Sequence, residues 1–418
     1  MEPMERSVTE SVKKPKTSLA PPVDALGDDL VGRILLRLPD MASLASAALV
    51  CKSWAPVASS PAIYRNFLSL RRPPLVGFIL TDHVRVPRYC PELCFISAGS
   101  GNPNLATAVA DGDFFFEDIP DIDSDDEEEY YHDEWRLRGC DGGRLLLSHG
   151  WNSVDLAVYD PLERTAVFFR PPNAWRHSFH MVRYAILASE TDSSFRVIGF
   201  QQWGDAFSAV FSSGSRKWVM IDSDADRHVG DDFHHIMSDG TSAGRFVYWR
   251  SDTKKVKYYK TKEKIMVLDT ETMVWSVIKP PFPPGESYCI ADMAEHGGLC
   301  IVSSKEQCVQ LWVRNSNNEW MLKKEVLLLN KFGYLKKLRR DEWMKRVRIL
   351  AVKAGYVYME FWSIRKPHSY LLVLNLNTTK LKIFRNQSTK PYRGSAFPFF
   401  LRFPPLPATD DDNKLRGA

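Results

Sequence analysis

Five strand–turn–strand units, spaced 45 to 61 residues apart, constrain the fold of this chain more than any other feature. Each unit is a short run of β-branched and aromatic residues, then a polar turn, then a second such run. A repeat of about 45–60 residues matches a four-stranded propeller blade, near the roughly 50 residues of a kelch-type repeat. An apolar residue follows the first turn residue by six positions in the pairs Asp160 and Ala166, Ser212 and Trp218, Asp269 and Trp275, Arg314 and Trp320, and Asn375 and Leu381.

Two further strand candidates lie upstream of these units, at residues 75–80 and 93–99. They add a sixth unit, and radial closure of the blades would protect the many sheet edges that such a chain otherwise exposes. We therefore predict a propeller of six blades over residues 74–405. The tryptophans at the repeat position are expected in the core between blades; they are Trp218, Trp275 and Trp320.

A helical segment precedes the strands. Leu26, Leu30, Ile34 and Leu38 recur every four residues and form one wide apolar face on a helix. Asp28 and Asp29 fall in its first turn, where carboxylates favour the positive end of the helix dipole, and Pro39 ends it. Further short helices are predicted over residues 41–50, 51–58 and 61–70. So short a segment buries little area, so a large partner or a neighbouring domain should complete its core.

Composition and charge place the chain among ordinary globular proteins. It is 44% hydrophobic and 25% charged, which excludes a mostly disordered or fibrous chain, and its net charge of +4 does not indicate a polycation aimed at nucleic acid. Seven scattered cysteines form no disulfide framework, which favours a reducing compartment. The N-terminus has no apolar run typical of a signal peptide, and no stretch is long and apolar enough to span a membrane. We expect the protein in the cytoplasm, the nucleus or both.

The predicted fold class is multidomain, a small three-helix segment followed by an all-β propeller. The expected boundaries are a flexible leader over residues 1–22, the helical domain over 23–70, the propeller over 74–405, and a polar tail over 406–418. Residues 117–134 are dense in carboxylates that repel one another, so they are expected to form a mobile loop within the propeller.

The helical segment resembles an F-box. The family pattern reads here as "LGDDLVGRILLRLP", then Leu44, then "VCKSW" over residues 50–54, followed by "SSPAIYRNF". Gly27 stands where most members have proline. The resemblance covers residues 26–67, about a tenth of the chain, and both the order and the spacing of the motif fit.

The F-box resemblance implies docking on a Skp1-type adaptor, which hangs on a cullin scaffold that carries a RING protein. Some of the residues concerned would contact the adaptor, and others would only hold the small helices together. The residues that the resemblance assigns to forming or supporting the adaptor-binding surface are Leu26, Leu30, Ile34, Leu35, Leu38, Pro39, Leu44, Val50, Cys51 and Trp54.

The rest of the chain resembles the kelch-like, F-box-associated propellers of plant F-box proteins. The phrase "CDGGRLLL" followed by "VYDPLERTAVFFRPP" is similar to their typical first blade. This resemblance implies a non-catalytic substrate-recognition subunit of an SCF-type ubiquitin ligase, whose propeller binds a target protein. An F-box scaffold or decoy acting outside ubiquitination is the first alternative, and a propeller enzyme is the second.

Loop aromatics and basic stretches are the candidates for target contacts. Trp151, Trp175 and Trp203 fall in predicted loops, and tryptophan is enriched at binding hot spots, although packing between blades would explain them equally. The basic stretches 251–264 and 336–348 would suit a phosphorylated or acidic degron. A charged loop explains them more simply than nucleic-acid binding does.

No motif indicates catalysis, a metal or a cofactor. The chain lacks a phosphate loop, a dinucleotide fingerprint and a nucleophile elbow. Neither Cys90 with Cys94 nor Cys300 with Cys308 has zinc-site spacing, and the histidine pairs near them in sequence do not complete four ligands. We therefore expect no enzyme activity, no metal and no cofactor.

Overall fold

A computed structural model gives the structure of the chain. It describes residues 26–39, 41–50, 52–70, 75–82, 92–98, 103–119, 135–149, 155–175, 182–189, 193–201, 207–221, 239–250, 263–283, 286–305, 307–315, 317–329, 331, 347–353, 355–362, 369–385 and 396–401. The predictions for the leader, for most of the acidic stretch, for the polar tail and for nearly all of both basic stretches lie outside these ranges. So do those for Cys51, Trp151 and Trp203.

The chain divides into two compact units, one holding the helices up to Phe67 and the other running from Leu68 to Pro405. The helical unit has α1 (Asp28–Leu35), α2 (Met41–Val50), α3 (Trp54–Ala58) and α4 (Pro61–Leu70), close to the predicted helices. Asp28 and Asp29 occupy the first turn of α1, as the sequence indicates. α4 follows the three helices that the sequence assigned to the F-box.

The core of the helical unit is small. Its buried side chains come from all four helices and are Val31, Leu35, Leu44, Ala58 and Phe67. Gly32 allows a close approach of α4 to α1, because a β-carbon on Gly32 would lie 2.9 Å from Cδ1 of Ile63. Few apolar side chains are therefore removed from water within this unit, which agrees with the expected need for a partner.

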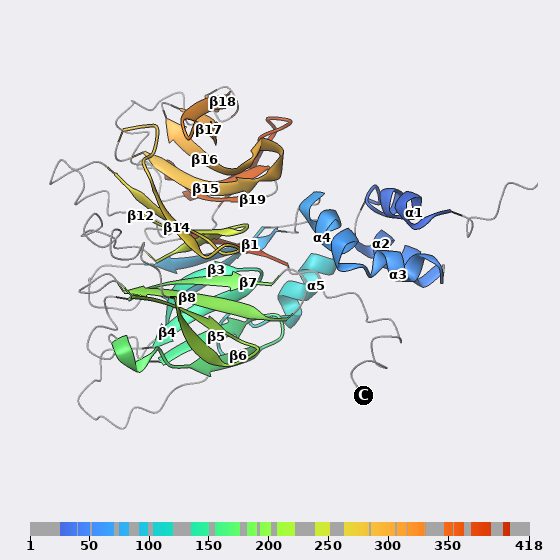
Figure 1. Cartoon of the computed structure of the whole chain (residues 1–418), viewed down its shortest axis with the longest axis horizontal. Coiled ribbons are helices and arrows are strands. Elements are labelled where there is room, and N and C mark those ends of the chain that lie inside the picture. Colours follow the sequence, from blue (N-terminus) through green and yellow to red (C-terminus); the bar gives the residue numbers. More distant parts are fainter. Residues whose placement is uncertain are drawn as a thin grey trace, which may run out of the picture. The chain divides into compact units, whose positions relative to one another are not determined.

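The second unit is a six-bladed β-propeller (Figure 1). Its four-stranded antiparallel sheets, in chain order, are β3 (Trp135–Asp141), β4 (Arg144–His149), β5 (Asp155–Asp160) and β6 (Thr165–Phe169); β7 (Val182–Ala188), β8 (Phe195–Gln201), β9 (Phe207–Ser212) and β10 (Lys217–Ile221); β11 (Thr241–Ala243), β12 (Phe246–Arg250), β13 (Ile265–Asp269) and β14 (Val274–Ile278); β15 (Ser287–Met293), β16 (Gly298–Lys305), β17 (Cys308–Arg314) and β18 (Trp320–Leu327); and β19 (Val347–Lys353), β20 (Tyr356–Trp362), β21 (Ser369–Asn375) and β22 (Leu381–Arg385).

The sixth sheet joins the two ends of the propeller sequence. It contains β1 (Leu75–Asp82), β2 (Glu92–Ser97) and β23 (Ala396–Phe400) in the order β2-β1-β23. β1 and β2 are the upstream pair that the sequence predicted, while β23 comes from the far end of the chain. The innermost strands β3, β7, β11, β15, β19 and β23 each contact the next, and β23 contacts β3, so the ring is closed.

The predicted repeat is the outer hairpin of each four-stranded blade. In all five, the first turn residue ends the third strand, and the sixth residue after it lies in the fourth strand. The structure adds a feature that the sequence does not show, because the residue four positions after the first turn residue always has a positive φ of 51° to 63°. These five residues are Arg164, Arg216, Met273, Asn318 and Thr379.

The two faces of the propeller differ in the length of their connections. The links between first and second strands and between third and fourth strands have 2 to 6 residues. The links from one four-stranded blade to the next strand in the chain have 8 to 19 residues, and antiparallel pairing places them on the opposite face. Leu75, where β1 begins, pairs with Phe400 at the end of β23, so both lie on the short-turn face.

Helix α5 (Pro103–Asp111) and the loop after it also belong to the short-turn face. The Asp113 N–H donates to the carbonyl of Pro161 in the β5–β6 turn, at 2.7 Å. The Phe114 ring stacks on Phe95 of β2, with ring centres 4.1 Å apart, and meets the Phe399 ring edge to face. The loop therefore fastens the seam between the closing blade and the β3–β6 blade.

Candidate protein-binding surfaces

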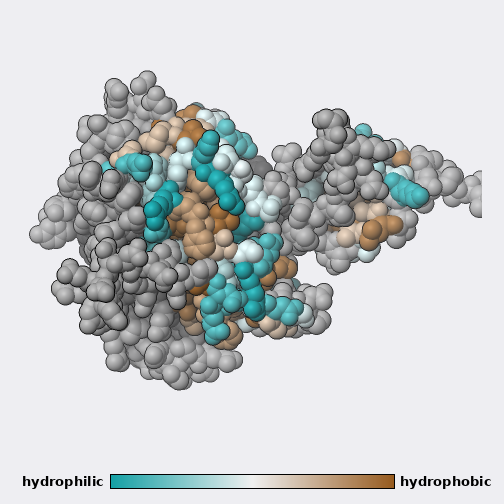
Figure 2. All heavy atoms as spheres, turned by 90° about the horizontal axis from the view of Figure 1, so that it is seen from below, coloured by the Kyte–Doolittle hydropathy of each residue, from teal (hydrophilic) through white to brown (hydrophobic). Residues whose placement is uncertain are grey.

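The first candidate surface is the outward side of α1. Val31 and Leu35 point into the core of the helical unit, whereas Leu26, Leu30 and Ile34 are 37%, 51% and 40% exposed. These three side chains lie four residues apart, so they follow one line along the helix. Figure 2 shows a small hydrophobic patch on the surface of this unit. An unburied apolar stripe on a unit with so small a core is the expected form of a partner-binding surface.

The other predicted adaptor-binding residues occupy different environments. Leu35 and Leu44 are fully buried, so they support the surface rather than form it. Pro39 is exposed, and Leu38 and Trp54 are half-buried. The side chains of Val50 and Cys51 lie outside the described part of the chain.

Leu49 on α2 is an exposed residue that the sequence reasoning missed. It is 83% exposed, more than any residue of the α1 stripe. α2 is apolar almost all round, with the sequence "MASLASAALV", so its periodicity does not separate an inner from an outer face. Leu44 faces the core and Leu49, five residues later, lies on another side of the helix.

Gly27 positions the start of α1. Its carbonyl accepts hydrogen bonds from the N–H groups of Leu30 and Val31, at 2.9 and 3.1 Å. Its φ of −64° and ψ of 152° are those of extended backbone, and a β-carbon there would meet no atom within 4 Å. Proline fixes φ near this value, so the residue that most F-boxes carry would fit at this position.

The prediction that Trp175 is an exposed target contact is wrong. Trp175 ends the short 3-10 helix Asn173–Trp175 after β6, and its side chain is fully buried. Its ring contacts those of Tyr184 and Trp218, with centres 6.4 and 5.6 Å away. It also covers Gly199, where a β-carbon would lie 2.5 Å from the indole. Trp175 therefore packs between blades, which was the other explanation that the sequence allowed.

The tryptophans at the repeat position lie between blades, as predicted. The Trp218 indole N–H donates to the carbonyl of Arg170, which follows the outer strand of the preceding blade, at 2.7 Å. The Trp320 indole makes the same bond to the carbonyl of Lys279, at 2.9 Å. Trp275 is buried among residues of β8 and of its own blade. The repeat position therefore joins each outer strand to the neighbouring blade.

Charged side chains near the start of several inner strands are paired across blades. Arg138 of β3 forms an ion pair with Asp239, 3.0 Å apart, and donates to the carbonyl of Val182 on β7. Arg348 and Glu360 pair between β19 and β20. Burial raises the pKa of Glu360, although the nearby Arg348 guanidinium acts in the opposite direction. These groups bind the blades to one another, because each has a structural partner.

The described residues carry no recognisable catalytic chemistry. Burial raises the pKa of the Cys300 thiol to about 12, so this sulfur is protonated at neutral pH and is a poor nucleophile. No group of three or more metal-ligating side chains comes together within the described ranges. None of the described helices combines the length and the hydropathy that a membrane crossing requires.

Comparison with protein families identifies both units. The β-propeller of the F-box protein AT5G49610-like family matches residues 136–406, and an F-box-like domain matches residues 24–69. No curated protein matches the chain.

Solved propellers resemble the chain only remotely. A hypothetical selenium-binding protein from Sulfolobus tokodaii is 9% identical with a TM-score of 0.36, covering 78% of this chain and 93% of its own. The Aleuria aurantia lectin is 10% identical with a TM-score of 0.33, covering 63% and 80%. TolB from Acinetobacter baumannii is 7% identical with a TM-score of 0.29, covering 61% and 68%. Likenesses this weak say nothing about function, whereas the family match covers most of the chain. The chain belongs to the AT5G49610-like family of F-box β-propeller proteins.

Proposed function

The chain is a protein of the F-box substrate-adaptor type. We propose that it is the substrate-recognition subunit of an SCF-type ubiquitin ligase. The observation that carries this proposal is the exposed apolar stripe of Leu26, Leu30 and Ile34 on a helical unit that matches the F-box family. A Skp1-type adaptor would cover this stripe, remove it from water and complete the small core.

The proposed mechanism is proximity without covalent catalysis by this chain. The adaptor would connect the F-box to a cullin and its RING protein, which brings a ubiquitin-charged E2 enzyme near the bound target. Holding two reactants in one complex raises their effective concentration. The chain's own task is then to bind two proteins, and the protonated Cys300 thiol is consistent with a non-catalytic subunit.

We assign target binding to the long-connection face of the propeller. Long connections on a rigid scaffold are where binding residues concentrate. Trp151 and Trp203 belong to the β4–β5 and β8–β9 connections of this face, so they stay candidates for target contacts. The chain enters the propeller at Leu75 on the short-turn face, which leaves the long-connection face without the tether to the F-box.

Co-purification of partners with the full chain tests the ligase assignment. Leu30→Lys with Ile34→Lys would place two charges on the exposed stripe, and we expect both the Skp1-type adaptor and the cullin to be lost. The matched control is Val219→Lys with Val274→Lys, because these valines are 65% and 58% exposed on outer propeller strands. The control should retain both partners.

Two results would contradict the proposal. If the stripe variant retains the adaptor as well as the control does, the stripe is not the docking surface. If the wild-type chain binds the adaptor but never recruits a cullin, the protein is an adaptor-bound scaffold or decoy outside ubiquitination. We also propose a cytoplasmic or nuclear location, which fractionation of cells expressing the full chain would test.

A further inference from the structure

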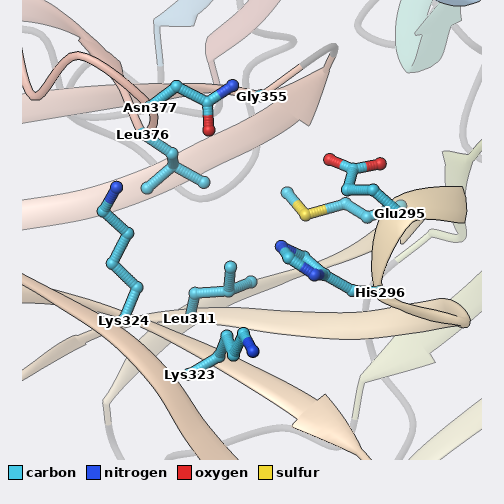
Figure 3. A pocket seen from close by; sticks show the side chains of 9 residues that line it. Glu295, His296, Leu311, Lys323, Lys324, Gly355, Leu376 and Asn377 are labelled. Atoms are coloured by element: carbon cyan, nitrogen blue, oxygen red, sulfur yellow. The ribbon is translucent and has the colours of Figure 1, made fainter.

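A half-open pocket lies between two neighbouring blades on the short-turn face of the propeller (Figure 3). Its volume is about 220 Å³. It is built by the β15–β16 connection, the β17–β18 hairpin and the turns at the ends of β19 and β21. The lining residues are Met293, Glu295, His296, Leu311, Lys323, Lys324, Gly355, Leu376 and Asn377.

A β-bulge brings two consecutive lysines to this pocket. Leu311 of β17 pairs with Lys324 of β18, but the next residue, Trp312, pairs with Leu322. Lys323 is the extra residue and has no partner in the register. Consecutive side chains of a regular strand point to opposite faces, whereas a bulge re-aims one of them. Both lysines therefore line one pocket.

The charges in the pocket are free to meet a ligand. Within the described ranges, neither Lys323 nor Lys324 forms an ion pair with a carboxylate. Figure 3 shows the Lys324 ammonium pointing towards the Asn377 amide and the His296 ring pointing into the pocket, while Glu295 lies on the side away from Lys324. Two ammonium groups thus face one carboxylate, and the pocket favours an anion.

The remaining lining sets the size and the stem of that anion. Met293, Leu311 and Leu376 supply an apolar wall beside the polar groups. Sites for drug-sized ligands occupy about 300–1,000 Å³, so this pocket fits a smaller group. Lysine binds phosphate as a point charge, and histidine and asparagine can donate hydrogen bonds to the remaining oxygens.

We propose that this pocket binds a phosphate monoester carried on a short apolar stem. The same chemistry has two sources, a free small phosphate ester or a phosphorylated side chain of a polypeptide. The site lies on the short-turn face and does not depend on the adaptor-binding stripe, so the proposal stands apart from the ligase assignment.

Ligand-observed NMR titration of the full chain tests the proposal. The probes are phenyl phosphate, phenol, and a short alanine peptide with one central phosphoserine beside its unphosphorylated form. The test variant is Lys323→Gln with Lys324→Gln. The matched control is Lys217→Gln with Lys279→Gln, which removes the same charge from exposed positions on other outer strands.

The wild type and the control should bind the phosphorylated probes and not phenol or the unphosphorylated peptide. The Lys323 and Lys324 variant should bind them about tenfold more weakly or worse, because charge-assisted contacts are lost. Equal binding of phenyl phosphate and the phosphopeptide would indicate a free ester, and preference for the phosphopeptide would indicate a modified side chain. Undiminished binding by the double-lysine variant, or no preference for phosphorylated probes in the wild type, would overturn the proposal.

Discussion

At the scale of single residues, Gly27 shows how a departure from a family pattern can be structurally harmless. Its backbone already has the φ that proline imposes, and the space around its α-carbon is open. The carbonyl of Gly27, not its N–H, receives the first hydrogen bonds of α1. The glycine therefore leaves the folded geometry intact and mainly gives the unfolded chain more freedom.

Gly27→Pro should stabilise the helical unit by about 0.4–1 kcal/mol, because proline reduces the conformational entropy of the unfolded chain. Amide hydrogen exchange of residues 28–35 would measure this as slower opening of α1. Gly27→Ala serves as the comparison and should show a smaller effect. Faster exchange in the proline variant would show that the loop before α1 requires the glycine.

Asp113 carries a pH dependence that follows from its hydrogen bonds. Its carboxylate accepts the Tyr159 O–H at 2.5 Å and the N–H groups of Asp118 and Glu117 at 3.0 and 3.1 Å. Burial raises the pKa of Asp113, but these hydrogen bonds outweigh it, so the pKa lies below its ordinary value. A lowered folded-state pKa stabilises the protein above the unfolded value of about 4, and this contribution is lost as the pH falls through the folded pKa.

Asp113→Asn should therefore cost about 1–3 kcal/mol near pH 7, and the deficit against wild type should shrink as the pH falls below about 4. Urea unfolding at a series of pH values from 7 to 3.5 would measure it. Asp111→Asn, at an exposed position two residues away, should unfold like the wild type throughout. A deficit that stays constant with pH would mean that Asp113 acts through shape alone.

At the scale of elements, the outer hairpins share a backbone device. Each places a non-glycine residue with positive φ four positions after its first turn residue. This conformation costs an ordinary residue roughly 1–2 kcal/mol, whereas glycine adopts it freely. Arg216 is the clearest case, because its φ is 52° and its side chain is exposed.

Arg216→Gly should raise the free energy of unfolding by about 0.5–1 kcal/mol, because relief of strain exceeds the entropy lost by glycine. Chemical denaturation of the full chain would show the gain. Arg196→Gly makes the same replacement at an exposed position inside β8 and should destabilise the protein. If both substitutions destabilise to the same degree, the hairpin residue is not strained.

The sequence predicts the elements well where their signals are local. The F-box helices, the six blades and the Trp218 and Trp320 positions follow from periodicity and turn residues. The positive φ is not predictable, because no glycine marks it. The two lysines at the bulge would be assigned to opposite faces by strand alternation, and only the register with β17 corrects this. The burial of Trp175 depends on Tyr184 and Gly199, which reach it only in the folded blades.

At the scale of the whole molecule, β23 closes the propeller. No local signal in "AFPFF" indicates that it pairs with β1, more than three hundred residues earlier. Phe399 packs with residues of the β3–β6 blade, and Phe400 packs with residues of the β19–β22 blade. Burying each phenylalanine contributes about 1.5–3 kcal/mol, so one short strand holds both sides of the seam.

A chain ending at residue 395 should lose this closure and expose the inner edge of β1, which is a site for aggregation. A chain ending at residue 405 removes only the polar tail and is the matched control. Size-exclusion chromatography and thermal unfolding should show a monomer with normal cooperativity for the longer chain and association or a lower midpoint for the shorter one. Identical behaviour of the two chains would mean that the ring is stable without β23.

The central claim is that the helical unit binds the adaptor and leaves the propeller free for a target. Hydrogen–deuterium exchange of the full chain, with and without a purified Skp1-type adaptor, tests this claim most directly. The account predicts that the adaptor slows exchange in α1, α2 and α3, over residues 28–58, and leaves the strands of residues 75–400 unchanged. Unchanged exchange in the helices, or protection that appears on the propeller instead, would contradict it.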